Sequence, residues 1–376
     1  MRPARASTGF FRWVPINPRP YQRLVTSRRV EEEIFSGLEY VSEIPEIGSQ
    51  LIQKRGTALE KIDVTFSNLQ AFIRQAKTFY YAAEGLHHRA SPLNHYYSFL
   101  NLAKALICLH DANLVSGQIR HGLSHQLSQG DLTAQELVVQ SGVFPLFYKE
   151  VTGHEIPINT RIRVTDLFRY VTDVALESSS AGFGFCRVFR AQYRIKKAQS
   201  IGFATIVVHR FKEFSTCTPA LDHLLKTYEQ VTDKNILVRD VFGLFAEEQS
   251  ECALLETRKE FPVSSDNIPV GEITTHCREG IEPLYMSFPF QHDSTDFMLC
   301  LPLGDDMKMP FNELLGIYAL TYFLSSLVRY YPAYLEGRLH SKDAWVIESF
   351  ARSTPLTFLR HVSNLLIGED RAYLVR

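Results

Sequence analysis

SPLNHYYSFLNLAKALICLHDANL, residues 91–114, is a long apolar segment with the spacing of a buried helix. Its apolar side chains recur three and four positions apart, at Tyr96, Phe99, Leu100, Ala103, Leu106 and Ile107. Ser91 suits an N-cap and Pro92 suits a first helical turn, while Asn113 and Gly117 are suited to end the helix. The segment therefore predicts a helix over residues 92–114.

The residues on either side of this segment predict further helices. Residues 56–86 carry an apolar stripe at Leu59, Ile62, Phe66, Leu69, Ile73, Ala76 and Tyr80. Because only a few residues separate this helix from the next, we expect the two to pack antiparallel. Apolar residues between Pro310 and Pro332 predict a helix over 311–331, and SKDAWVIESF (341–350) and STPLTFLRHVSNLLIG (353–368) predict two more helices.

Between about residues 140 and 305 the pattern changes to short β-branched and aromatic runs separated by turn residues. These runs predict a mostly antiparallel sheet: FCRVFRAQYRI, IGFATIVVHRF, NILVRDVFGLF, ECALLETRKEF and DFMLCLPL, with one helix in TPALDHLLKTYEQV. The order of helices, strands and helices predicts an α+β fold, a discontinuous helical bundle with an inserted β-rich segment. The expected parts are a leader and lead-in (1–55), half of the bundle (56–135), the insertion (136–305) and helices that complete the bundle (306–376).

The composition is that of an ordinary globular protein, with 45% hydrophobic and 22% charged residues among 376. A net charge of -1 argues against wholesale polyanion binding but allows a local basic patch. The six cysteines form no Cys-x-x-Cys pair, which predicts free thiols in a reducing cytoplasm. No apolar run reaches the ~18 residues that a membrane span needs, so no membrane is expected.

The first thirty residues contain seven arginines and no acidic residue. Four interpretations remain open for this segment: a nucleic-acid arm, an organellar transit peptide, a docking tail, or a leader with solvated arginines.

Three stretches in this order resemble the YaaC-like family of bacterial proteins, and the resemblance runs from about residue 90 to residue 370. They are SPLNHYYSFLNLAKALICL, RHGLSH followed by SGVFPLFYKEVTG, and ELLGIYALTYFLSSLVRYYPAYL. The helix HYYSFLNLAKALICL is also similar to the Tyr-Tyr helix of HEPN domains, which are helical bundles of toxin–antitoxin and antiviral systems. Many HEPN domains are ribonucleases marked by an arginine, a polar residue, a short gap and a histidine.

Arg120, His121 and His125 match that HEPN spacing, although here the motif follows directly after the Tyr-Tyr helix instead of lying on a late helix. The resemblance implies a metal-independent ribonuclease or toxin-like effector of a bacterial defence system. It further implies RNA as substrate, a homodimer, and a partner protein from the same defence or toxin–antitoxin system. Neither a cofactor nor a catalytic metal is expected.

The chemistry of RNA cleavage suits these residue types. In metal-independent cleavage the 2′-hydroxyl attacks the phosphorus and the 5′-oxygen leaves. Histidine, whose ordinary pKa is near ~6.5, can take the proton from the first oxygen or give one to the second, and arginine can hold the phosphate. We therefore expect Arg120 to bind the phosphate, His125 to act as general acid or base, and His121 to orient the site or supply the second proton transfer. Lys104 and Arg329 are candidate substrate-binding residues.

Other interpretations of the motif stay open at this point. Arg120 could pair with an acidic residue while the histidines pack against helices, or His121 and His125 could bind a metal with His110. A non-catalytic HEPN-like module that binds a protein or a nucleotide is the alternative function. Convergence of Arg120, His121 and His125 in an open basic groove would favour the nuclease, and their dispersal would favour the binding module.

Overall fold

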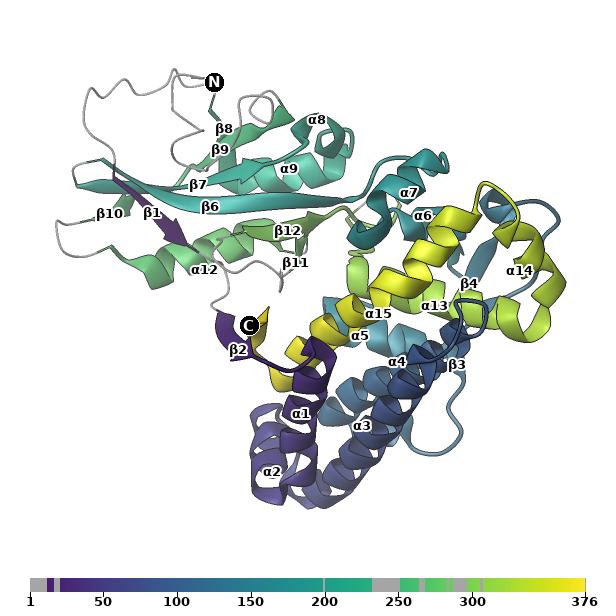
Figure 1. Ribbon diagram of the computed structural model, residues 1–376. Coiled ribbons are helices and arrows are strands. Elements are labelled where there is room, and N and C mark those ends of the chain that lie inside the picture. The colour runs from purple at the N-terminus through teal and green to yellow at the C-terminus, as the bar shows by residue number, and fades with distance from the viewer. Residues whose placement is uncertain are drawn as a thin grey trace. The chain divides into compact units, whose positions relative to one another are not determined.

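The computed structural model describes residues 12–16, 21–198, 200–231, 251–263, 268–282, 284–286, 296–304 and 307–375. The chain divides into two compact units (Figure 1). The sheet unit consists of Met1–Tyr21 and Arg187–Asn312, and the helical unit consists of Gln22–Cys186 and Glu313–Arg376. The helical unit is thus discontinuous in sequence, and the predicted α+β class is confirmed.

The sheet unit is built on an antiparallel sheet with the strand order β11-β12-β6-β7-β9-β8. Strand β1 also pairs with β6, and β10 pairs with β7. The strands are β1 (Arg12–Ile16), β6 (Val188–Ala198), β7 (Ile201–Val208), β8 (Tyr228–Gln230), β9 (Ala253–Thr257), β10 (Phe261–Pro262), β11 (Tyr285–Met286) and β12 (Asp296–Cys300). The helices described here are α8 (Phe211–Phe214), α9 (Thr218–Thr227) and α12 (Val270–Ile281).

Four of the five sequence runs that predict strands contain strands of this sheet, which are β6, β7, β9 with β10, and β12. The fifth run, NILVRDVFGLF, lies outside the described residues. The helix predicted in TPALDHLLKTYEQV is α9.

The helical unit is organised around α4 (Ser91–His110), whose side chains are buried almost along its whole length. Helix α4 packs against α3 (Ile62–Glu84), α5 (Val143–Thr152), α13 (Glu313–Tyr330) and α15 (Ala344–Ile367) (Figure 1). The rings of Phe99 and Phe358 stack with centroids 3.8 Å apart at the contact between α4 and α15. Helices from both ends of the chain therefore share one core, as the sequence pattern predicts.

Short elements complete the helical unit. They include β2 (Tyr21–Thr26), whose first residue lies at the boundary, α1 (Val30–Glu43), α2 (Pro45–Lys54), α6 (Val164–Phe168), α7 (Ala175–Ser180), α14 (Pro332–Leu339) and β13 (Asp370–Val375), which pairs with β2. A separate three-stranded sheet has the order β3-β4-β5, with β3 (His121–His125), β4 (Glu136–Gly142) and β5 (Arg161–Arg163). Residues 136–186, expected as part of the insertion, thus lie in the helical unit.

The two separate C-terminal helices predicted at 341–350 and 353–368 are wrong, because α15 continues through Pro355. An interior proline costs a helix about 3 kcal/mol or more. Here Phe350 and Phe358 are both buried on the two sides of Pro355, and Thr354 Oγ1 donates to the carbonyl oxygen of Phe350 at 2.7 Å. Tertiary packing along the whole helix therefore outweighs the local preference to break it.

No helix in the described part of the chain is both long enough and apolar enough to cross a membrane.

Candidate functional site

The RHGLSH motif lies on an edge strand of the three-stranded sheet, not on a helix. Strand β3 pairs antiparallel with β4, with His121 opposite Gly142 and His125 opposite Leu137. A bulge falls between His121 and Leu123, where Gly122 has a φ of 82°. A Cβ atom at Gly122 or at Gly142 would meet main-chain atoms, so two glycines allow the two strands to approach at this bulge.

His121 is half-buried against the tyrosines of two helices. Its Nδ1 lies 2.8 Å from the hydroxyl oxygen of Tyr96 on α4, and its ring centroid lies 6.1 Å from that of Tyr322 on α13. Burial lowers the pKa of His121, and the positive charges of Arg329 and Lys104 lower it further. The imidazole of His121 is therefore neutral near pH 7, and one of its nitrogens is engaged by Tyr96.

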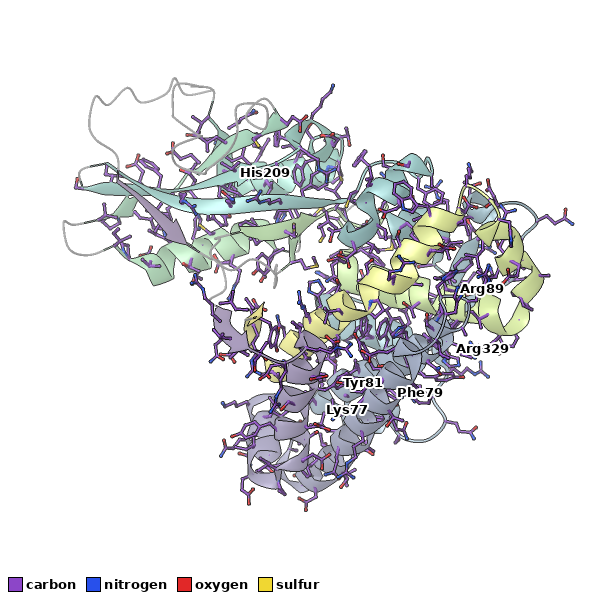
Figure 2. All side chains as sticks on the ribbon, in the orientation of Figure 1. Lys77, Phe79, Tyr81, Arg89, His209 and Arg329 are labelled. Atoms are coloured by element: carbon purple, nitrogen blue, oxygen red, sulfur yellow. The ribbon has the colours of Figure 1, made fainter. Side chains whose placement is uncertain are left out.

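Arg329 lies in the last turn of α13 (Figure 2), within cation–π distance of two tyrosine rings. Its guanidinium carbon is 4.9 Å from the ring centroid of Tyr330 and 6.0 Å from that of Tyr97. One guanidinium nitrogen donates to the Tyr97 hydroxyl at 3.3 Å, and the ring of Tyr97 stacks on that of Phe79 at 5.3 Å. Within the described ranges no carboxylate pairs with Arg329. We call Tyr97, His121, Arg329 and Tyr330 the Arg329 cluster.

Lys104 is the second cation that acts on His121. Its ammonium nitrogen lies 5.8 Å from the ring centroid of Phe72, and burial lowers the pKa of the amine. No ion pair to Lys104 is found in the part of the chain that the structure describes. The positive charge of Lys104 destabilises the imidazolium form of His121. For the same reason, a negatively charged ligand is more favourable near His121 than a further positive charge.

Both ring nitrogens of His125 lie within hydrogen-bond distance of neutral side chains. The amide nitrogen of Gln135 donates to the carbonyl oxygens of Ser128 and Asp131, so Gln135 Oε1 faces His125 as an acceptor. Nε2 of His125, 3.3 Å from that oxygen, therefore carries the proton, and Nδ1 accepts from Ser326 Oγ at 3.4 Å. Burial lowers the pKa of His125, which keeps this neutral tautomer near pH 7.

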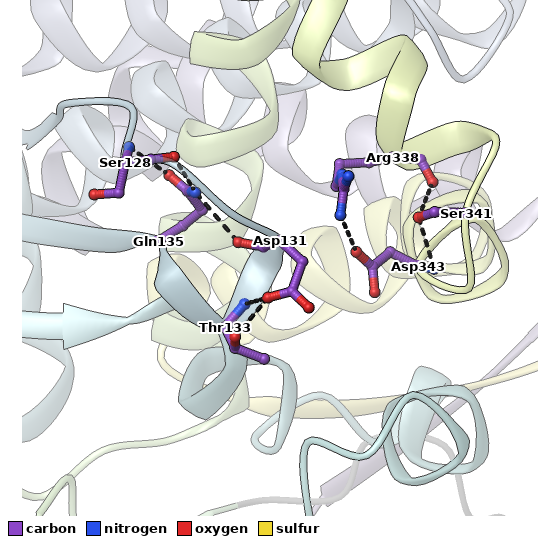
Figure 3. Close-up of polar contacts among 7 residues, drawn as sticks. All are labelled: Ser128, Asp131, Thr133, Gln135, Arg338, Ser341 and Asp343. Atoms are coloured by element: carbon purple, nitrogen blue, oxygen red, sulfur yellow. Dashed lines mark hydrogen bonds and ion pairs between the residues drawn. The ribbon is translucent and has the colours of Figure 1, made fainter.

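The Gln135 network was not predicted from the sequence, and a single buried glutamine carries no periodic signal that could reveal it. Gln135 is fully buried and ties the loop from Ser128 to Asp131 (Figure 3). Arg338 and Asp343 form a separate ion pair in the same view, at 3.4 Å.

The structure brings together only part of the predicted set of site residues. His121, Lys104 and Arg329 interact electrostatically, whereas Arg120 is exposed and its side chain has no hydrogen bond or ion pair within the described ranges. His121 and His125 are four residues apart on β3, at most about 13 Å along the backbone, because the bulge at Gly122 shortens the strand. Among the described residues, no three His, Cys, Asp or Glu side chains are grouped so that they could hold a metal ion.

Comparison with known proteins links most of the chain to one family. The family model described as YaaC-like Protein matches residues 49–366, which covers α3, α4, the RHGLSH motif, α13 and nearly all of α15. Searches among curated proteins and among solved structures return no match.

Proposed function

The chain belongs to the YaaC-like protein family, and on that premise we propose that its helical unit binds a nucleotide or single-stranded RNA without cleaving it. The single observation that carries the proposal is the guanidinium of Arg329 beside the rings of Tyr97 and Tyr330, with no carboxylate paired to it among the residues that the structure describes. The HEPN-like character of the bundle, its place in a defence system and the homodimer belong to the same proposal.

The chemistry of the Arg329 cluster suits a nucleotide. The planar guanidinium group can donate two parallel hydrogen bonds to a phosphate. Tyr330 is 65% exposed, so its ring can stack on an unpaired base, an interaction worth about 1–3 kcal/mol per base. Tyr97 is buttressed by Phe79, which holds one wall of the cluster in place before a ligand arrives.

The arrangement of the motif favours binding over cleavage. Cleavage through the 2′-hydroxyl needs a base and an acid on the two sides of one phosphate. In one copy of the chain, both nitrogens of His125 already have partners, and one nitrogen of His121 is engaged by the Tyr96 hydroxyl. Neutral His121 beside an unpaired cation nevertheless supports a second candidate, a metal-independent ribonuclease in which a second copy supplies the other proton-transfer group.

The test compares binding of a fluorescein-labelled single-stranded RNA and of AMP to the wild type, Arg329→Gln and Arg74→Gln. Arg74 is an exposed, ion-paired arginine on α3, so its replacement changes the net charge equally. Loss of a charge-assisted contact of about 1.5 kcal/mol or more should weaken binding about tenfold or more in Arg329→Gln and leave Arg74→Gln near the wild type. Equal affinities of the two variants, or no binding by the wild type, would contradict the proposal.

A cleavage assay separates the two candidates. Total RNA is incubated with pure protein in EDTA, and a substrate with a 2′-deoxy nucleotide 5′ of the cut serves as control. We expect intact RNA from the wild type. Cleavage that needs the 2′-hydroxyl and is lost in His121→Ala would establish the ribonuclease instead. In that case light scattering should report a mass near twice 43.0 kDa, which would show that two copies are present.

A further inference from the structure

The helical unit contains a cavity of about 660 Å³ beside the first turns of α4. His121 and the rest of the Arg329 cluster are not among its lining residues. Residues from four helical regions line it: the start of α1, the end of α3, the first turns of α4 and the middle of α15. Its apolar wall comes from Ala83, Leu86, Ala351, Pro355 and Leu356. This volume falls within the ~300–1,000 Å³ typical of small-molecule sites.

His95 lines this cavity and is 6% exposed. Its Nδ1 atom is buried and, within the described ranges, has no hydrogen-bond partner. The ring centroid of Tyr80 lies 5.5 Å away from that of His95 and the ring centroid of Phe99 lies 5.9 Å away. Because Nδ1 is closed to a water-sized molecule, another part of the ring faces the cavity, and His95 contributes the surface of a neutral imidazole to the lining.

Three other polar groups of the lining are available to bind a ligand. In the described part of the chain the Tyr80 hydroxyl, Ser91 Oγ and the Arg352 guanidinium have no hydrogen-bond or ion-pair partner. The acidic lining residues differ, because Glu31 and Glu84 are both paired with Arg29. The groups left for a ligand are therefore hydroxyls, an imidazole and one guanidinium.

We propose that this cavity binds a small organic anion, with its carboxylate or phosphate oxygens on Tyr80, Ser91 and Arg352 and its apolar body against Leu86 and Pro355. The positive end of the α4 dipole adds to the attraction, because Ser91 is the first residue of that twenty-residue helix. His95 contacts the ligand through its ring. The site is independent of the Arg329 cluster and does not require the proposed nucleotide binding.

The experiment measures binding of benzoate and of phenyl phosphate to the full chain by calorimetry and by the rise in Tm. We expect at least one probe to bind, with the affinity reduced about tenfold or more in Arg352→Gln, the loss expected for a charge-assisted hydrogen bond. Tyr80→Phe, which removes only the hydroxyl oxygen, should weaken the same probe. The probe that binds better identifies the anionic group.

Two controls keep the result interpretable. Arg329→Gln should bind the probes like the wild type, so failure here and failure of the proposed nucleotide binding are distinguishable. The unfolding midpoints of Arg352→Gln and Tyr80→Phe without ligand show whether each variant is folded, and Arg352 is exposed, so its replacement should not unfold the protein. No binding of either probe, or equal binding by wild type and Arg352→Gln, would overturn the proposal.

Discussion

Nδ1 of His121 lies 2.8 Å from the hydroxyl oxygen of Tyr96, and this contact joins the edge strand β3 to the central helix α4. Tyr96 is fully buried, so its hydroxyl has a fixed position from which it orients the imidazole. Helix α13 also borders His121, through Tyr322 and Arg329. Three segments far apart in the sequence thus define the surroundings of one histidine.

The first prediction concerns the titration of His121. Because the positive charge of Arg329 disfavours the imidazolium, Arg329→Gln should raise the pKa of His121 toward the ordinary histidine value. The recovery should be partial, since burial is the larger cause of the lowered pKa. A pH titration of the imidazole ¹H–¹³C signals measures it, with Arg74→Gln as the charge-matched control. An unchanged or lower pKa in Arg329→Gln would contradict the placement of Arg329.

The second prediction concerns the bulge that positions His121. Gly142 has a φ of 144°, and a Cβ there would meet the carbonyl group of Arg120 and the backbone nitrogen of Gly122. Gly142→Ala should therefore lower the free energy of unfolding by roughly 2 kcal/mol or more. Gly337→Ala on α14 is the control, because nothing lies within 4 Å of the new Cβ. Urea unfolding should show that variant unchanged or slightly stabilised; similar losses in both variants would argue against the strained bulge.

The third prediction concerns acid stability. Burial lowers the pKa of His95 to about 4, below its ordinary value of 6.5, so between these values the unfolded chain binds more protons than the folded one. His95 therefore contributes a loss of stability as pH falls from 6.5 to about 4, of the order of 3 kcal/mol when complete. His95→Gln should show a shallower decline than the wild type over this range. Parallel curves of unfolding free energy against pH would rule out a neutral buried His95.

The fourth prediction concerns the loop anchored by Gln135. Gln135→Glu keeps the shape but replaces the amide donor that binds the carbonyl oxygens of Ser128 and Asp131 with an acceptor. Burying that carboxylate should lower the free energy of unfolding by roughly 3 kcal/mol or more near pH 7, and less at a pH where the new carboxyl group is protonated. The matched control is Gln126→Glu, an exposed position in the same loop. Equal urea midpoints for the two variants would show that the network is unimportant.

Much of the fold follows from local patterns. The three-and-four spacing in 56–86, 92–114 and 311–331 predicts α3, α4 and α13, because a helix with one or more buried faces must repeat apolar side chains at that period. The largest error is at the start of α3, which begins at Ile62, six residues after the predicted start. Period-two and β-branched runs likewise predict β6, β7, β9 and β12. Lys104 and Arg329 are candidate binding residues on the sequence alone, because each is a cation in or at the end of an apolar helix.

Other features depend on contacts that no local pattern contains. Pro355 signals a helix break, yet packing on both sides of it keeps α15 continuous. RHGLSH is too short and too polar for periodicity to distinguish a strand from a turn or helix, and its pairing with β4 makes it a strand. A strand spaces His121 and His125 farther apart along the backbone than a regular helix would.

The α+β class, the main helices and strands and the return of the chain to the helical core can all be derived from local pattern, because each depends on the hydrophobic periodicity of a continuous segment. The grouping of charged and aromatic side chains instead depends on how the helices and strands pack. His121 and Arg329 are more than two hundred residues apart, and α4 brings them together because it packs against α13 while its Tyr96 binds His121. Such a grouping arises from the packing of helices and strands against one another, so the residue spacing within a single helix or strand cannot predict it.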